Sequence, residues 1–221
     1  MKSMLITGSG SGLGAAVATQ ASKHGWSTIG VDVRPSPSAD EYRVADVSDF
    51  SSLHEALREI ESIDAVVTCA GIDHPGALAS VRHDAWDNII KVNLIGTANV
   101  ARWALSRFPN SGGHIMTVAS TLGLRAVGEA TAYCASKFGV VGFTRALSVE
   151  LGSQHAVTLV IPGGMRTSFF DHREERFKPG PEAQLADPKD IAEMMIAALN
   201  QPSSGAIREM IITPPGETSW P

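Results

Sequence analysis

The chain has 221 residues, of which 43% are hydrophobic and 19% charged, a composition typical of one ordinary globular domain. A formal net charge of −5 provides no basic surface for nucleic acid or an anionic membrane, so neither is an expected partner. The opening residues MKSMLITG hold too short an apolar run for a signal sequence or a membrane span, which predicts a cytoplasmic protein. The two cysteines cannot build a disulfide framework and the histidines show no metal-binding spacing, so we expect no metal.

Short apolar runs alternate along the chain with longer segments of helical period. The runs predict strands at 3–7, 27–32, 41–46, 64–70, 113–120, 156–162 and 208–213. The intervening segments predict helices at 12–24, 50–60, 83–108, 131–152 and 188–200. This alternation predicts an α/β fold, a doubly wound, Rossmann-type parallel sheet of about seven strands with helices on both faces.

No linker rich in proline, glycine or serine divides the chain, so residues 1–221 are expected to form a single domain. The stretch 168–187, SFFDHREERFKPGPEAQLAD, is long, charged and weakly periodic, which predicts a substrate lid. Its basic residues alternate with acidic ones, so we expect them to be solvated rather than aimed at an anionic substrate. They are Arg173, Arg176 and Lys178.

The stretch LITGSGSGLGAAV crowds four glycines between the first predicted strand and the first predicted helix. Backbone N–H groups in such a turn, together with the positive end of the helix, can hold a pyrophosphate that missing Cβ atoms allow to approach. Gly10, Gly12 and Gly14 match the GxGxG of many S-adenosylmethionine methyltransferases. Thr7, Gly8, Gly12 and Gly14 match the TGxxxGxG of short-chain dehydrogenases. The turn alone leaves both readings open.

Two later features are needed to separate these readings. Asp32 ends the second predicted strand and can accept both hydroxyls of an adenosine ribose, which suits either class of protein. Tyr133 and Lys137 stand four residues apart in AYCASKFGVVGF, so a helix places them on one face beside a common ligand. A methyltransferase has no use for this pair.

Together these motifs resemble the short-chain dehydrogenase/reductase family, in which YxxxK is the signature. Ser120 in TVASTLG resembles the catalytic serine of the family, and Asn93 in KVNLIG its catalytic asparagine. IPGGMRT resembles the PGxxxT segment that wraps the nicotinamide, and ADVSD the segment that contacts adenine. The resemblance thus implies a cofactor site made of Thr7, Gly8, Ser11, Gly12, Leu13, Gly14, Asp32, Asp46, Val47, Ala70, Gly71, Lys137, Pro162, Gly163 and Thr167.

The sequence departs from the family pattern at supporting positions. TCAG replaces the usual NNAG, so that Cys69 stands where the family has an asparagine. The serine motif, which ends at Ser120, reads VAS where the family commonly has ISS. The tail REMIITPPGETSWP lacks the common glycine-rich ending, which leaves the far wall of the substrate site undefined.

The resemblance implies an alcohol dehydrogenase or carbonyl reductase that moves a hydride between a secondary alcohol and nicotinamide. Tyr133 is the expected acid/base, its pKa lowered by Lys137 and by the positive charge of oxidised nicotinamide, and Lys137 is also expected to bind ribose. Ser120 is expected to hold the substrate oxygen and Asn93 to support a water that links Lys137 to solvent. A methyltransferase and a non-catalytic nucleotide-binding module are the alternatives.

The acidic Asp32 disfavours the 2′-phosphate of NADP, so we expect NAD, although Arg34 lies near enough in sequence to favour NADP. The short polar lid favours a small polyhydroxylated substrate, such as a sugar or cyclitol. Apolar residues on several faces of the two long helices predict a homodimer or homotetramer. These residues are Trp103, Phe138, Val141 and Phe143.

Overall fold

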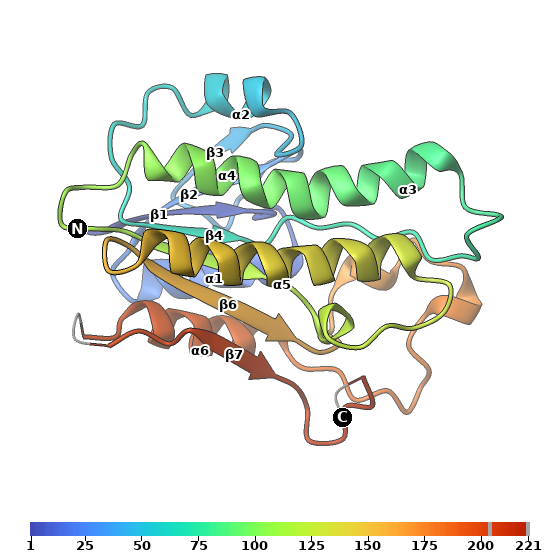
Figure 1. The fold of residues 1–221 in the computed structure, drawn as a ribbon. Coiled ribbons are helices and arrows are strands. Elements are labelled where there is room, and N and C mark those ends of the chain that lie inside the picture. The colour runs from blue at the N-terminus through green and yellow to red at the C-terminus, as the bar shows by residue number, and fades with distance from the viewer. Residues whose placement is uncertain (203–204, 220–221) are drawn as a thin grey trace.

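Seven parallel strands form one sheet at the centre of the molecule (Figure 1). The structure is a computed structural model that describes residues 1–202 and 205–219. The strands are β1 (Ser3–Thr7), β2 (Ser27–Asp32), β3 (Glu41–Val44), β4 (Ala65–Thr68), β5 (His114–Val118), β6 (Ala156–Pro162) and β7 (Glu209–Ile212). Their order is β3-β2-β1-β4-β5-β6-β7. Successive strands are added on one side of β1 as far as β3 and on its other side from β4 onward, so the switch point lies between β1 and β4. The predicted doubly wound fold is confirmed.

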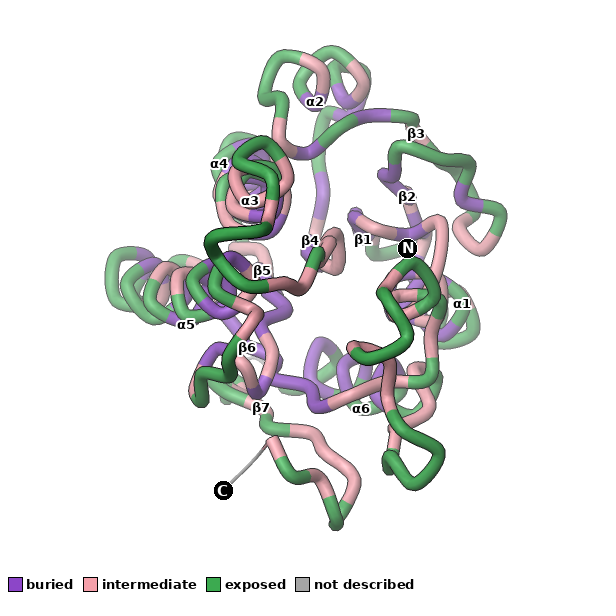
Figure 2. The backbone as a smooth tube through the Cα atoms, turned by 90° about the vertical axis from the view of Figure 1, so that its right-hand side faces the viewer, coloured by how far each residue is buried: buried purple, intermediate pink, exposed green. Residues whose placement is uncertain are grey.

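Helices cover both faces of this sheet, as the view along the strands shows (Figure 2). They are α1 (Gly12–Lys23), α2 (Phe50–Ala56), α3 (His83–Ile90), α4 (Gly96–Leu105), α5 (Thr131–Leu151) and α6 (Pro188–Leu199). Helices α1 and α6 pack together on one face, and α2, α4 and α5 cover the other. No helix among the described residues is both long and apolar enough to cross a membrane.

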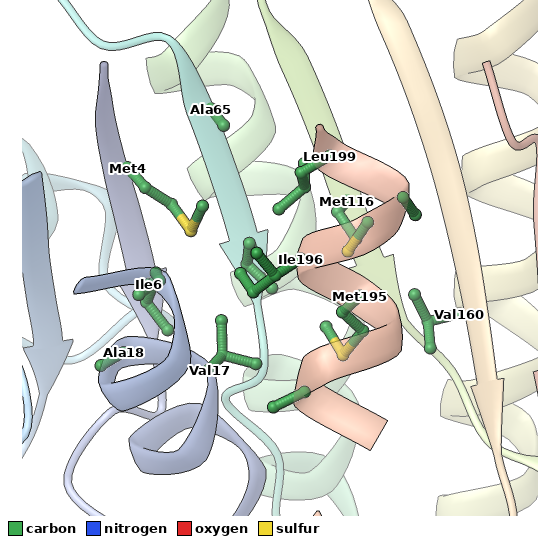
Figure 3. Packing of buried hydrophobic residues seen from close by; sticks show 14 of the residues in the cluster. Met4, Ile6, Val17, Ala18, Ala65, Met116, Val160, Met195, Ile196 and Leu199 are labelled. Atoms are coloured by element: carbon green, nitrogen blue, oxygen red, sulfur yellow. The ribbon is translucent and has the colours of Figure 1, made fainter. Parts of the chain in front are cut away.

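The sheet is held between two apolar cores. On the α1 and α6 side, Met4 and Ile6 of β1 meet Val17 of α1 and Met195 and Ile196 of α6, all fully buried (Figure 3). Burying each such side chain contributes about 1.5–3 kcal/mol. The N-terminus of α6 is stabilised because the Asp187 side chain caps it by accepting a hydrogen bond from the Lys189 amide, and Pro188 occupies the first helical position. These cores fix the strand ends from which the site is built.

The predicted helix at 83–108 is interrupted. A π-helical turn at Lys91–Ile95 separates α3 from α4 and contains Asn93. Such a turn inserts an extra residue into the helical repeat and is frequently found at functional sites. The apolar pattern predicted one continuous helix because a single inserted residue barely disturbs its period.

Candidate active site

A cleft of about 590 Å³ opens at the carboxyl ends of the strands, where the strand order reverses. One half lies over the glycine turn and the ends of β2 and β3; we call it the glycine-turn half. The other half lies between the first turns of α5, the 168–187 segment and the chain after β7; we call it the outer half. Tyr133 and Lys137 line the cleft where the two halves meet.

The glycine turn lies against the backbone that follows β4. Gly8 has φ +68°, and a Cβ there would come within 2.7 Å of the Ala70 backbone. A Cβ on Gly14 would lie 2.2 Å from the Gly8 carbonyl oxygen. Ser11, which precedes α1, makes no capping hydrogen bond from its side chain, and the first residues of the helix, from Gly12 to Gly14, line the cleft. This arrangement suits a pyrophosphate.

Asp32 is buried at the end of β2 and aims its carboxylate at the glycine turn. Its Oδ2 accepts from the Gly10 amide at 3.0 Å and its Oδ1 from the Arg34 amide at 3.0 Å. The Arg34 guanidinium lies beside the glycine turn, with Nη2 donating to Ser11 Oγ at 3.2 Å and Nε 3.8 Å from Asp32 Oδ1. An acidic and a basic side chain therefore face the same end of the cleft.

Asn93 ties the segment after β4 to α5. Its Oδ1 accepts from the Ile72 amide at 2.8 Å, and its Nδ2 donates to the Ile72 carbonyl and to Ser136 Oγ, each at 3.0 Å. Both amide hydrogens are thus engaged, which leaves an Oδ1 lone pair as the side chain's remaining site for a water. Ser136 is a partner that sequence reasoning missed.

Tyr133 and Lys137 share one face of α5, with Lys137 Nζ 5.6 Å from the centre of the Tyr133 ring. Lys137 Nζ also donates to the Val118 carbonyl at 2.9 Å. Ser120 caps the short turn after β5 by accepting from the Leu122 amide at 3.1 Å, and its hydroxyl faces Tyr133. The sequence-predicted trio therefore meets at one place.

The electrostatics of the pair differ from expectation. Burial raises the pKa of Tyr133 to about 12, with Asp73 adding to the rise, and the hydroxyl of Ser120 and the charge of Arg173 lower it only in part. Burial also lowers the pKa of Lys137 to about 8. The nearby charges of the chain alone therefore do not lower the tyrosine pKa, because burial outweighs them, and the lowering by oxidised nicotinamide stays a prediction.

Most of the sequence-predicted cofactor residues line the cleft. These are Gly8, Ser11, Gly12, Leu13, Gly14, Asp32, Asp46, Val47, Ala70, Gly71, Lys137, Pro162, Gly163 and Thr167. Thr7 and Asn93 lie behind its wall instead. Thr7 is buried and accepts a hydrogen bond from the Ala70 amide at 3.3 Å, so it braces the turn.

The outer half holds an ion pair that the sequence did not predict. Arg173 Nη2 lies 2.6 Å from Asp73 Oδ2, with the two side chains only 16% and 4% exposed. The expectation that Arg173 is solvated is wrong, because its partner lies 100 residues away along the chain. Arg176 and Lys178, in contrast, form exposed ion pairs with acidic neighbours, as expected.

The chain after β7 supplies the far wall of the cleft. Glu217 Oε2 accepts from the Gly164 amide at 3.0 Å, and Ser219 Oγ lies 2.6 Å from Thr121 Oγ1. Phe169 stands beside Tyr133, with ring centres 5.9 Å apart. No local motif marks these residues, because each reaches the cleft through a contact between distant segments.

Comparisons with known proteins agree with this geometry. The profile described as short chain dehydrogenase matches residues 2–177. The mouse (Mus musculus) (3R)-3-hydroxyacyl-CoA dehydrogenase is 30% identical, over 92% of this chain and 90% of its own. Glycine betaine reductase ATRR of Emericella nidulans is 29% identical over 98% of this chain, which spans only 19% of that protein. The alcohol dehydrogenase of Thermococcus sibiricus, solved with 5-hydroxy-NADP, has the same fold, with a TM-score of 0.83, 22% identity and 96% coverage of each chain. The chain belongs to the short-chain dehydrogenase/reductase family and is an NAD(P)-dependent oxidoreductase.

Proposed function

We propose that this protein interconverts an alcohol and the corresponding ketone or aldehyde, with Tyr133 as the acid/base and NAD as the preferred cofactor. The main support for this proposal is that Tyr133, Lys137 and Ser120 meet in the cleft, between the glycine turn and the outer half. The glycine turn offers the cradle for a dinucleotide, and a Cβ at Gly8 or Gly14 would collide with main-chain atoms and displace the turn that forms it. Bound nicotinamide supplies or accepts the hydride.

The roles of the chain's own residues follow from their positions. In reduction, the Tyr133 hydroxyl gives its proton to the substrate oxygen, and in oxidation the Tyr133 phenolate receives the alcohol proton. With a pKa raised to about 12, the phenolate needs positive charge beside it. Lys137 and an oxidised nicotinamide ring both bring such charge. Ser120 orients the substrate oxygen by a hydrogen bond, and Asn93 holds α5 and the segment after β4 in place.

Asp32 supports NAD over NADP. The 2′-phosphate would bring a double negative charge toward a carboxylate that is only 8% exposed. Arg34 favours the opposite choice, and the Thermococcus sibiricus enzyme was solved with an NADP derivative. We favour NAD because the Arg34 side chain is already engaged with Ser11 and near Asp32, while the carboxylate stays at the ribose end of the cleft.

The outer half supports a small polyhydroxylated substrate, and we propose that the 168–187 segment is the lid that covers it. Phe169 and Phe170 line this half and offer ring faces to the C–H groups of a sugar or cyclitol. Asp73, Glu217 and Ser219 add polar atoms that can bind hydroxyl groups. Pockets of this kind combine apolar walls with a few placed polar groups.

A homodimer or homotetramer is part of the proposal. Trp103 and Val141, which suggested it in the sequence, are buried within the chain, but Phe138 of α5 is 45% exposed and Val149 of the same helix 84%. Covering these side chains by a second copy removes apolar surface from water. Light scattering at micromolar concentration tests this, and a monomer contradicts it.

Cofactor titration tests the proposal most directly. Nicotinamide fluorescence is expected to report NADH binding. Small alcohols are expected to turn over with NAD, and small ketones with NADH. In Lys137→Met, both binding and turnover should fall, because the variant loses the charge beside Tyr133 and a ribose ligand together. Turnover of long apolar substrates alone would contradict the substrate class.

A further inference from the structure

The ion pair between Arg173 and Asp73 joins the lid to the segment after β4, directly beside Tyr133. Arg173 Nη2 meets Asp73 Oδ2 at 2.6 Å, and its Nη1 donates to the Phe177 carbonyl at 3.2 Å. Its guanidinium also lies 4.6 Å from the centre of the Phe170 ring. The one arginine therefore organises the lid internally and fastens it to the body of the protein.

The Phe169 ring lies next to both Arg173 and Tyr133. Its ring centre lies 5.3 Å from the Arg173 guanidinium and 5.9 Å from the Tyr133 ring centre. Asp73, Arg173 and Tyr133 all line the same cleft. A change in the position of Arg173 is thus a change in the charge that Tyr133 experiences.

The two charges of the pair act on Tyr133 in opposite directions. The Asp73 carboxylate disfavours the phenolate and raises the tyrosine pKa, whereas the Arg173 guanidinium lowers it. Cys134 on α5 also acts on Tyr133, Lys137 lies 5.6 Å from its ring, and Cys69 after β4 acts on Lys137. His172 of the lid and Glu217 line the same cleft. Among the groups that shift the pKa of Tyr133, only Arg173 belongs to the lid.

We propose that Arg173 is a positioning residue through which lid closure switches Tyr133 on for proton transfer. With the lid closed, Arg173 neutralises Asp73, and the tyrosine can pass its proton to the substrate oxygen in reduction, or lose it to solvent and then accept the alcohol proton in oxidation. With the lid open, Asp73 stands unpaired beside the hydroxyl and holds the proton on it. The inference rests on the proposed function, in which Tyr133 is the acid/base, and adds a reason why chemistry waits for the closed state.

Two single substitutions separate this role from a purely structural latch. Arg173→Met leaves Asp73 unpaired, so the acidic limb of the kcat/KM profile for alcohol oxidation is expected to move up by about 1 pH unit. Asp73→Asn removes the carboxylate and leaves the arginine, so the limb is expected to move down by a similar amount. The double variant Arg173→Met/Asp73→Asn is expected to return close to the wild-type profile.

A mere latch predicts a different pattern. Both single variants would then loosen the lid alike and change KM in the same direction, with no opposite movement of the two profiles. Arg176→Met is the matched control, because Arg176 also joins the lid to the segment before α5, through Glu129 at 2.9 Å, but is 58% exposed. It is expected to leave the profile unchanged.

A second readout keeps the inference separate from turnover. The chain has two tyrosines, so in a Tyr42→Phe background the near-ultraviolet phenolate absorbance reports Tyr133 alone. Titrated with NAD bound, the same variants are expected to show the same opposite shifts. Shifts in one direction, or none, would overturn the inference even in an active enzyme. Opposite shifts in a protein without alcohol oxidation would support it and contradict only the proposed activity.

Discussion

The two halves of the cleft are held together by different means. In the glycine-turn half, backbone meets backbone: the turn packs on the chain after β4 so closely that a Cβ on Gly8 or Gly14 would collide with main-chain atoms. In the outer half, side chains from distant segments meet, as Arg173 does with Asp73 and Glu217 with the Gly164 amide. The backbone contacts of the first half leave no room for a larger residue, whereas the contacts of the second depend on which side chains the distant segments carry.

The largest expected effect lies where the halves meet. Tyr133→Phe removes the proton-transferring hydroxyl and keeps the ring, so kcat is expected to fall by about 1,000-fold. NADH affinity, measured by fluorescence titration, should stay within about twofold, since uniform binding contacts are unchanged. Normal turnover in this variant would contradict the mechanism, and lost NADH binding would mean that the hydroxyl also positions cofactor.

Asp32→Ala tests the glycine-turn half for cofactor choice. The wild-type protein is expected to prefer NAD over NADP by about 30-fold to 1,000-fold in kcat/KM, from lost hydrogen bonding and added repulsion. The variant should bring the two cofactors toward parity, mainly through a higher KM for NAD, because the ribose loses its acceptor. Equal use of both cofactors by the wild type, or a preference for NADP, would contradict the role of Asp32.

A pair of glycine substitutions tests the contrast between backbone and side-chain contacts. Gly14→Ala places a Cβ 2.2 Å from the Gly8 carbonyl oxygen, so the free energy of unfolding is expected to drop by about 1–3 kcal/mol. At Gly163 the nearest atom is Glu217 Oε2 at 2.6 Å, the end of a flexible side chain. Gly163→Ala should therefore cost less than about 1 kcal/mol. Urea unfolding of both variants measures the difference, and equal costs would contradict the comparison.

The same contrast explains which parts of the molecule the sequence predicts. Strand and helix positions follow from local apolar period, and the glycine turn, Asp32 and the Tyr133–Lys137 pair follow from short spacings within one element. The π-helical turn around Asn93 escapes prediction because one extra residue leaves the apolar pattern almost intact. Asp73 and Arg173, 100 residues apart, escape it because their meeting depends on how the 168–187 segment folds against the rest of the chain.

The smallest expected effect concerns the chain after β7. Glu217→Gln keeps the size of the side chain but weakens its bonds to the Gly164 and Ser219 amides. A partly exposed hydrogen bond of this kind is worth about 0.5–1 kcal/mol, so the KM for substrate should rise about twofold to fivefold, with NADH affinity unchanged. Glu209→Gln, on β7 and paired with Arg145 outside the cleft, is the matched control.

The pH dependence of this contact has a definite sign. Burial raises the pKa of Glu217, but hydrogen bonds from the Gly164 and Ser219 amides outweigh burial and hold the pKa below its ordinary value of 4.5. A depressed folded pKa means that the contact contributes fully above pH 4.5 and is lost as the pH falls through the lower, folded-state pKa. Below that point the KM of the wild type should approach that of Glu217→Gln. A constant ratio between the two across the acid range would show that the carboxylate charge does not hold the far wall of the cleft.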